Sequence, residues 1–291
     1  MGITAELKYA FRQGSMLHRL IYLNLGVFVI VTLVRTGLWL FQIHDLSFVD
    51  WFSVPASTSE LLMYPWTVLT YMFFHIDFLH ILFNLLWLYW FGKIFLEYFD
   101  EKMLLVTYLM GGIFGALFFI GAYNVFPAFD SFISFSRLLG ASASIIAIVV
   151  TLAFFVPNHV IHIVLIGPVR IKYVALISVL LYVIGISSSN PGGNLAHLGG
   201  AFWGMIYGLG LRNGKNYGRG VENLLSALKS PFRTKNKLRV SYRSMNNHEY
   251  NAMKNEEKKE IDRILDKIGR SGYDSLSKDE KEVLFRAGKK N

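Results

Sequence analysis

The chain has 291 residues, enough for one large or two small domains, and 53% of its residues are hydrophobic. Its mean hydropathy of +0.40 is higher than a soluble domain of this length needs, and the apolar residues occur in long runs. The absence of cysteine excludes disulfides, thiol nucleophiles and thiolate metal sites. The composition therefore indicates an integral membrane protein.

The formal net charge of +9 resides in the C-terminal part of the chain. Residues 1–211 hold nine Lys or Arg and nine Asp or Glu, whereas residues 212–291 hold twenty and eleven. A basic tail can bind nucleic acid, but a basic segment directly after a membrane span more often contacts anionic lipid. We therefore expect a lipid contact and no nucleic-acid partner.

Six apolar stretches are predicted to cross the membrane as helices. Crossing a hydrocarbon core of roughly 30 Å takes about 20 residues, and the first three stretches reach this length. The last three are shorter, so they are either tilted or begin below the membrane surface, next to protein or water. The stretches are Leu20–Phe41, Phe78–Phe99, Met103–Phe126, Ser142–Val156, Lys172–Ile186 and Leu195–Leu211.

Two connections between these stretches are predicted to lie in the membrane interface. Gln42–Asp77 is rich in aromatic residues and low in charge. His159–Ile171 is apolar but is broken by Gly167-Pro168, so it is interpreted as an interfacial connector.

The Lys and Arg residues of the short connections predict the orientation of the chain. The first, third and fifth connections together hold one basic residue, Arg137, whereas the others and the N-terminal segment 1–19 hold several. Because cytoplasmic loops are enriched in Lys and Arg, both termini are expected in the cytoplasm. The compact six-span plan without a targeting peptide leads us to expect a bacterial inner membrane.

The segment after the six-span core 20–211 is predicted to have two parts. Residues 212–245 form a basic linker with a single acidic residue, Glu222. In residues 246–291, apolar side chains recur at helical spacing from Ile261, and Ser277-x-x-Glu280 is a capping box that precedes a second helix. This pattern predicts a small helical C-terminal segment.

Polar side chains inside spans are costly, and four of them open the even-numbered stretches. His80 and Asn84 stand four residues apart and so share one face of the second helix. Ser142 opens the fourth stretch and His197 the sixth. If the N-terminus is cytoplasmic, all three stretches begin in the outer leaflet, so the four side chains can converge there.

A serine next to a histidine has a chemical use. A hydroxyl is a poor nucleophile until an imidazole takes its proton. The backbone N–H of Ser142 at a helix N-terminus, with Asn84 and His80, would stabilise an oxyanion. No carboxylate lies near His197 in the sequence, which indicates a dyad and not a triad.

Each of these residues also has a purely structural interpretation. Ser142 taken alone would most often bond back to its own helix, and Asn84 would join two helices. Gly199, Gly200 and Gly204 are also typical of a small-residue packing face. A cluster of His and Asn is equally compatible with an ion or proton path, so chemistry alone does not name the reaction.

Three motifs occur in order along the spans. His75 followed by His80-Ile-Leu-Phe-Asn84 has the form HxxxxHxxxN, Gly140-Ala-Ser-Ala143 approaches GxSG, and Ala196–Gly204 has the form AHxxGxxxG. Together, over roughly residues 18–211, they resemble the rhomboid family of intramembrane proteases. Pro65-Trp66-Thr67 matches the usual region before the second span, although some members have Arg at the position of Thr67.

The resemblance implies an all-α membrane protein, a bundle of six transmembrane helices that cleaves transmembrane proteins without a metal or cofactor. It implies Ser142 as nucleophile and His197 as general base, with His80 and Asn84 around the oxyanion. His75, Gly140, Gly200 and Gly204 match structural positions near the site. The main alternative is a catalytically silent rhomboid-like protein that binds membrane clients, and a transporter or channel is a more distant one.

Two positions depart from the family pattern. Ala143 replaces the second Gly of GxSG, beside the expected oxyanion site. Ile146 stands where some members have a Tyr that stacks on the catalytic His, so the orientation of the base must come from another residue. Neither departure removes a reacting group.

Overall fold

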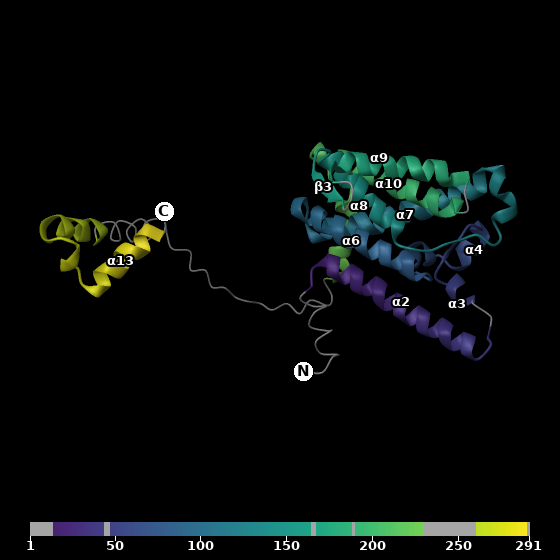
Figure 1. The fold of residues 1–291 in the computed structure, drawn as a ribbon, viewed down its shortest axis with the longest axis horizontal. Coiled ribbons are helices and arrows are strands. Elements are labelled where there is room, and N and C mark those ends of the chain that lie inside the picture. The colour runs from purple at the N-terminus through teal and green to yellow at the C-terminus, as the bar shows by residue number, and fades with distance from the viewer. Residues whose placement is uncertain (1–13, 44–46, 164–166, 188–189, 230–259, 290–291) are drawn as a thin grey trace. The chain divides into compact units, whose positions relative to one another are not determined.

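A computed structural model describes residues 14–43, 47–163, 167–187, 190–229 and 260–289. The chain divides into two compact units, Met1–Phe232 and Arg233–Asn291. The described part of the first unit is a bundle of six main helices, so the predicted all-α membrane fold is confirmed (Figure 1). These helices are α2 (Met16–Leu40), α6 (Phe78–Tyr98), α7 (Glu101–Val125), α8 (Ser142–Phe155), α9 (Ile171–Ile184) and α10 (Pro191–Arg212).

Three of these helices, α2, α6 and α7, are long and apolar enough to cross a membrane by themselves. The other three follow the shorter predicted stretches, but α10 begins at Pro191 and not at Leu195. Asn190 caps this helix by accepting a hydrogen bond of 3.0 Å from the N–H of Gly193. Proline suits the first helical position because no partner for its nitrogen is needed there. The cap therefore adds a turn before His197.

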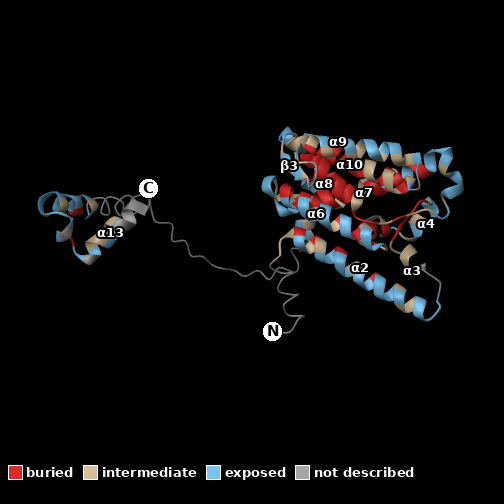
Figure 2. Ribbon diagram, viewed as in Figure 1, coloured by how far each residue is buried: buried red, intermediate tan, exposed pale blue. Residues whose placement is uncertain are grey.

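Helix α8 is the centre of the bundle. All eleven residues from Ala143 to Ala153 are buried, and Figure 2 shows the buried positions concentrated on α7, α8 and α10. A helix that is apolar on all sides lies either in a protein core or in lipid, and the burial of these residues puts α8 in the core. Ser142, the first residue of α8, therefore stands on the most enclosed element of the fold.

The glycines of α10 allow this helix to approach α8 closely. A Cβ atom at Gly204 would lie 2.6 Å from the carbonyl oxygen of Ala147, and one at Gly200 would collide with the carbonyl of Ala143. Small residues at such contacts let two helix backbones pack without intervening side chains. This close packing brings the first turn of α8 next to the part of α10 that carries His197.

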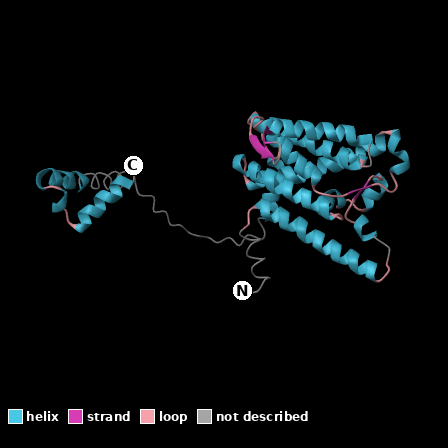
Figure 3. Cartoon of the chain, in the orientation of Figure 1, coloured by secondary structure: helices cyan, strands magenta, loops and turns pink. Residues whose placement is uncertain are grey.

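The first and third connections are joined by a short antiparallel strand pair, β1 (Val54–Pro55) with β2 (Arg137–Leu138), drawn in Figure 3. The Arg137 side chain forms ion pairs with Asp50 and Glu60 of the first connection. The remaining elements of these connections are α3 (Ser47–Asp50), α4 (Thr58–Met63), α5 (Thr67–Thr70), η1 (Tyr71–Phe73) and η2 (Pro127–Phe132).

The apolar connector after α8, which the sequence predicted to be an interfacial connector, contains a β-hairpin. Strand β3 (Val160–Ile163) pairs antiparallel with β4 (Gly167–Arg170), and His162 faces Pro168 in the register. Short apolar runs do not distinguish a strand from a loop by periodicity alone. The following helix, α9, has only two buried residues, Ile171 and Ala175, and continues into η3 (Gly185–Ser187).

Part of the segment predicted to be a basic linker is the amphipathic helix α11 (Arg219–Lys229). Asn216, just before this helix, accepts a hydrogen bond of 3.3 Å from the hydroxyl of Tyr207 on α10 and donates one of 2.9 Å to Glu222 on α11. Gly218 is buried against Val106 and Tyr207. The segment up to α11 therefore packs on the bundle.

The second unit contains, among its described residues, a helix over 260–271, η5 (Tyr273–Ser275) and α13 (Lys278–Lys289). The predicted capping box is confirmed. The N–H of Ser277 donates to the Glu280 carboxylate at 2.8 Å, and the N–H of Glu280 donates to Ser277 Oγ at 3.3 Å. Lys267 also donates to Glu280, at 2.9 Å, and so joins the two helices.

Candidate active site

The hydroxyl of Ser142 and the imidazole of His197 are in direct contact. Nε2 of His197 lies 2.6 Å from Oγ of Ser142, within hydrogen-bonding distance. Ser142 opens α8 and His197 lies on the second turn of α10. The glycine-mediated packing of the two helices therefore sets this distance.

The second ring nitrogen of His197 has no carboxylate partner. Its Nδ1 atom is buried and lacks any hydrogen bond to the described residues. Asp77 lines the same cavity, but it is not bonded to the imidazole. The arrangement is therefore a Ser–His pair. Because Nδ1 has no hydrogen bond, packing contacts must hold that side of the ring in place.

Three groups near Ser142 can donate hydrogen bonds to a developing negative charge. The first N–H groups of a helix have no partner within that helix, and Ser142 supplies the first of α8. The amide of Asn84 uses one N–H on the carbonyl oxygen of His80 at 2.9 Å, which leaves its second N–H available. Asn84 and the His80 imidazole line the same cavity as Ser142.

The segment before Ser142 is held by residues that precede α6. The N–H of Ala141 donates a hydrogen bond of 3.3 Å to Nε2 of His75, and the N–H of Gly140 donates one of 2.9 Å to the carbonyl of Tyr71. Gly140 has a φ of +113°, and a Cβ there would lie 2.7 Å from Cε1 of His80. Both observations require glycine at this position.

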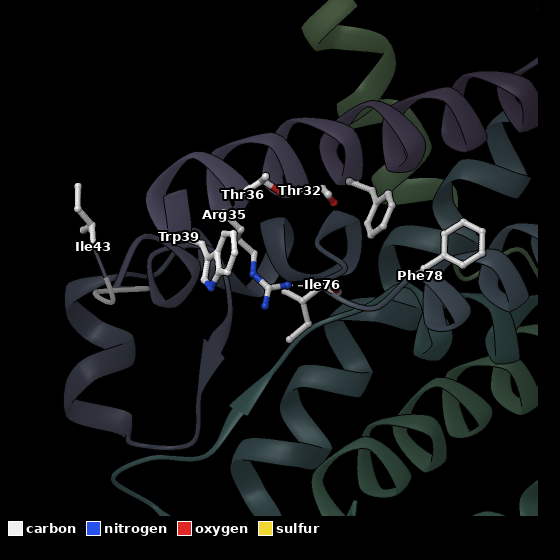
Figure 4. Close-up of a pocket in the computed structure, with 8 residues that line it drawn as sticks. Thr32, Arg35, Thr36, Trp39, Ile43, Ile76 and Phe78 are labelled. Carbon is white, nitrogen blue, oxygen red and sulfur yellow. Dashed lines mark hydrogen bonds between the residues drawn. The ribbon is translucent and has the colours of Figure 1, made fainter. Parts of the chain in front are cut away.

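The loop that carries His75 is itself tied to α2. Arg35 donates a hydrogen bond of 3.0 Å to the carbonyl of Ile76 (Figure 4). Arg35 and Trp39 lie beside a cavity of about 450 Å³ between α2 and the start of α6. Nothing in the sequence connects Arg35 with the site, because this contact joins α2 to a residue of the first connection that is 41 positions away.

A cavity of about 560 Å³ surrounds the Ser–His pair. Its polar lining includes the four predicted residues, and its apolar lining comes from α6, α8 and the third connection. The apolar lining residues include Phe83, Trp87, Leu138, Ile145 and Ile146. Such a site, with an apolar lining and few convergent polar groups, is typical of a ligand-binding or active site.

Tyr182 is a further residue of the site, beyond those predicted from the sequence. Its ring lies against the imidazole of His197, with ring centroids 4.3 Å apart and planes inclined by 50°. It comes from the last turn of α9 and lines the cavity. A possible signal was its position as the one polar residue in the apolar run Leu180–Ile184.

A family model for the rhomboid domain matches residues 63–214, more than half of the chain. The chain belongs to the rhomboid family. It is therefore an integral membrane protein of a family of intramembrane-protease type. The matched region contains all the residues that line the cavity around Ser142 and His197.

A second family model, described as a family of unknown function, matches residues 247–290 outside the rhomboid domain. A search of curated proteins gives no match. Among the described residues, no group of three or more His, Asp or Glu side chains has the arrangement of a metal site.

Proposed function

We propose that this rhomboid is an intramembrane serine endopeptidase that cleaves transmembrane proteins. The observation that carries the proposal is the 2.6 Å approach of His197 Nε2 to Ser142 Oγ at the N-terminus of a buried helix. A free serine is unreactive at neutral pH, and an imidazole at this distance is the usual means of activating it.

In the acylation step, Oγ of Ser142 attacks the carbonyl carbon of the scissile peptide while Nε2 of His197 takes the hydroxyl proton. The resulting oxyanion is stabilised by the N–H of Ser142, the free N–H of Asn84 and the imidazole of His80. Collapse of the tetrahedral intermediate breaks the C–N bond. His197 gives its proton to the departing amine, and an ester on Ser142 remains.

Deacylation repeats these roles with water as the nucleophile. A water molecule in the cavity gives a proton to His197 and attacks the ester carbonyl. The second tetrahedral intermediate releases the new carboxyl terminus, and the proton returns to Ser142. No step needs a metal or a cofactor, because the imidazole moves every proton and the site's own donors stabilise the charge.

We place both termini in the cytoplasm of a bacterial cell and the Ser–His pair toward the outer leaflet of its inner membrane. The distribution of Lys and Arg among the connections supports this topology. We further propose that the basic segment 212–245 lies on anionic lipid. The amphipathic character of α11, with Leu224 exposed, is compatible with that position.

Cleavage of a generic transmembrane substrate by the purified protein, compared with Ser142→Ala, tests the function directly. The wild type is expected to release fragments and to react with a fluorophosphonate probe, and the variant to do neither. A folded wild type that does neither would indicate the silent client-binding alternative. Ion flux in liposomes without proteolysis would indicate a channel or transporter.

A further inference from the structure

The proposed general base needs a group that orients its ring. The imidazole of His197 has one nitrogen on Ser142 and the other without a hydrogen-bond partner among the described residues. A ring held by one hydrogen bond can still rotate about its side-chain torsions. Ile146, four residues after the nucleophile, is aliphatic and offers no aromatic ring on the α8 side.

We propose that Tyr182 is the positioning residue for His197. Its ring centroid lies 4.3 Å from that of the imidazole, close enough for direct contact between the two tilted rings. Among the described residues, Nε2 of His197 is bonded to Ser142 and Nδ1 has no hydrogen bond, so the tyrosine hydroxyl does not bind the base. The aromatic ring, not the hydroxyl, is therefore the group that acts on His197.

A hydrogen bond between α10 and the C-terminal end of α9 holds the segment that carries Tyr182. The side-chain amide of Asn194 donates a hydrogen bond of 2.7 Å to the carbonyl of Gly185. Gly185 comes three residues after Tyr182, and Asn194 comes three residues before His197. This hydrogen bond therefore fixes the end of α9 about one helical turn away from the contact between the two rings.

The rest of α9 gives the contact little other support. Its only buried residues, Ile171 and Ala175, lie in the first half of the helix, whereas Leu181, Val183 and Ile184 near Tyr182 are exposed. The orientation of the base therefore depends on the docking of the end of α9, and outward movement of that end would release the imidazole.

The inference rests on the proposed protease function and is tested by the kinetics of the full chain. Tyr182→Phe keeps the ring and is expected to keep wild-type kcat. Tyr182→Met removes the ring at similar length and is expected to lower kcat about 10- to 100-fold with little change in KM, because a slightly misplaced catalytic group costs that much. Tyr89→Met is the matched control, since Tyr89 is an exposed tyrosine on α6 that does not line the cavity around His197.

Rescue from the opposite helix separates positioning from stability. Ile146 lines the cavity, so Ile146→Tyr added to Tyr182→Met places a new ring against His197 and is expected to restore kcat. Tyr182→Leu replaces Tyr182→Met if the latter does not fold. A folded ring-less variant with wild-type kcat would overturn the proposal, as would an equal loss in Tyr182→Phe or a change confined to KM. An inactive wild type would instead refute the protease function on which the proposal depends.

A second feature, a groove on the outside of the bundle, carries an independent inference. It encloses about 660 Å³ between α8, α9 and α10, and small residues on all three helices leave it hollow. Its apolar lining includes Ala153, Ala175, Val179, Ala201 and Met205. Its charged lining consists of Lys172 and Arg212, and no carboxylate of the described residues lines it.

The two cations lie at the same end of this groove. Lys172 is on the first turn of α9, and Arg212 ends α10, which runs in the opposite direction beside it. We propose that the groove binds an anionic phospholipid, with an acyl chain along the alanines and the phosphate on Lys172 and Arg212. Charge complementarity selects this occupant, because basic pockets between spans bind anionic headgroups.

Thermal unfolding in neutral detergent tests this site without reference to catalysis. Phosphatidylglycerol is expected to raise the Tm of the full chain more than phosphatidylcholine with the same chains. The difference is expected to vanish in Lys172→Gln/Arg212→Gln and to persist in Arg170→Gln/Lys215→Gln, which removes two cations outside the groove. Equal stabilisation by both lipids, or by glycerol phosphate alone, would overturn the proposal.

Discussion

The backbone N–H of Ala141 donates a hydrogen bond to Nε2 of His75, which holds the residue before Ser142. On the other side of Ser142, α8 is buried along nearly its whole length. The Ser142 side chain thus sits between a loop fixed by His75 and a rigid helix. This preorganisation is what a nucleophile requires, because its attack must start from a defined geometry.

Ser142→Ala and His197→Ala are each expected to abolish cleavage, and the double variant is expected to be no worse than either single one. The two groups share one hydrogen bond and act as one unit, so their losses do not add. Single-turnover rates on a transmembrane substrate measure the effect. Substantial turnover in Ser142→Ala would place the chemistry elsewhere.

Asn84→Ala is expected to lower kcat by about 10- to 1000-fold while the protein stays folded. The variant removes one donor to the oxyanion, and such donors contribute on this order. Asn124→Ala is a suitable control, because Asn124 also bonds to a carbonyl within its own helix but lies outside the cavity. An unchanged rate in Asn84→Ala would show that Asn84 only stabilises its helix.

Gly140→Ala is expected to reduce both activity and stability. The residue has a φ of +113°, and its new Cβ would press on the His80 ring, so a strain of about 1–3 kcal/mol is expected. Gly121→Ala on α7 is the control, since its Cβ would meet no atom within 4 Å. Thermal unfolding in detergent measures the loss of stability. Cleavage assayed at one temperature at which both variants are folded measures the loss of activity separately. Equal Tm values for the two variants would contradict the strain argument.

Much of the bundle could be predicted from the sequence because spans are long apolar runs that need no tertiary information. Ser142 and His197 could be proposed because polar residues at the start of spans are rare and chemically distinctive. The distance between them could not be predicted, since it depends on how closely Gly200 and Gly204 let α10 approach α8.

Other contacts were missed for a related reason. Tyr182 and Arg35 contact residues that are distant in the sequence, so their local sequence resembles that of any apolar helix. The β3–β4 hairpin is too short and apolar to be distinguished from a loop by pattern. Helix α11 was missed because it lies within 212–245, a segment whose many basic residues favoured the interpretation as a linker, although the helix itself holds only Arg219 and Lys229.

The C-terminal unit is expected to lose stability in acid. A hydrogen bond from Lys267, followed by one from the Ser277 backbone, lowers the pKa of Glu280 from 4.5 to about 2. A carboxylate with a lowered folded-state pKa contributes stability above its unfolded pKa and loses it as pH falls through the folded value. Amide NMR signals near Ser277 in the full chain should therefore stay unchanged above about pH 4.5 and shift toward those of an unfolded segment as pH approaches 2. Glu280→Gln should remove this dependence, and an identical titration in that variant would exclude Glu280 as its origin.

Two truncated chains are expected to differ in thermal stability because α11 packs on the bundle. Removal of 233–291 is expected to leave cleavage in detergent unchanged, because every group of the Ser–His site lies within the first unit. Removal of 212–291 also deletes Asn216 and Gly218, which pack on Tyr207 and Val106, and so exposes apolar surface of the bundle that is buried in the full chain. The shorter chain is therefore expected to melt at a lower temperature than the chain of residues 1–232. A folded chain of residues 1–232 without activity would show that the C-terminal unit takes part in catalysis, and equal Tm values for the two truncations would show that α11 does not support the bundle.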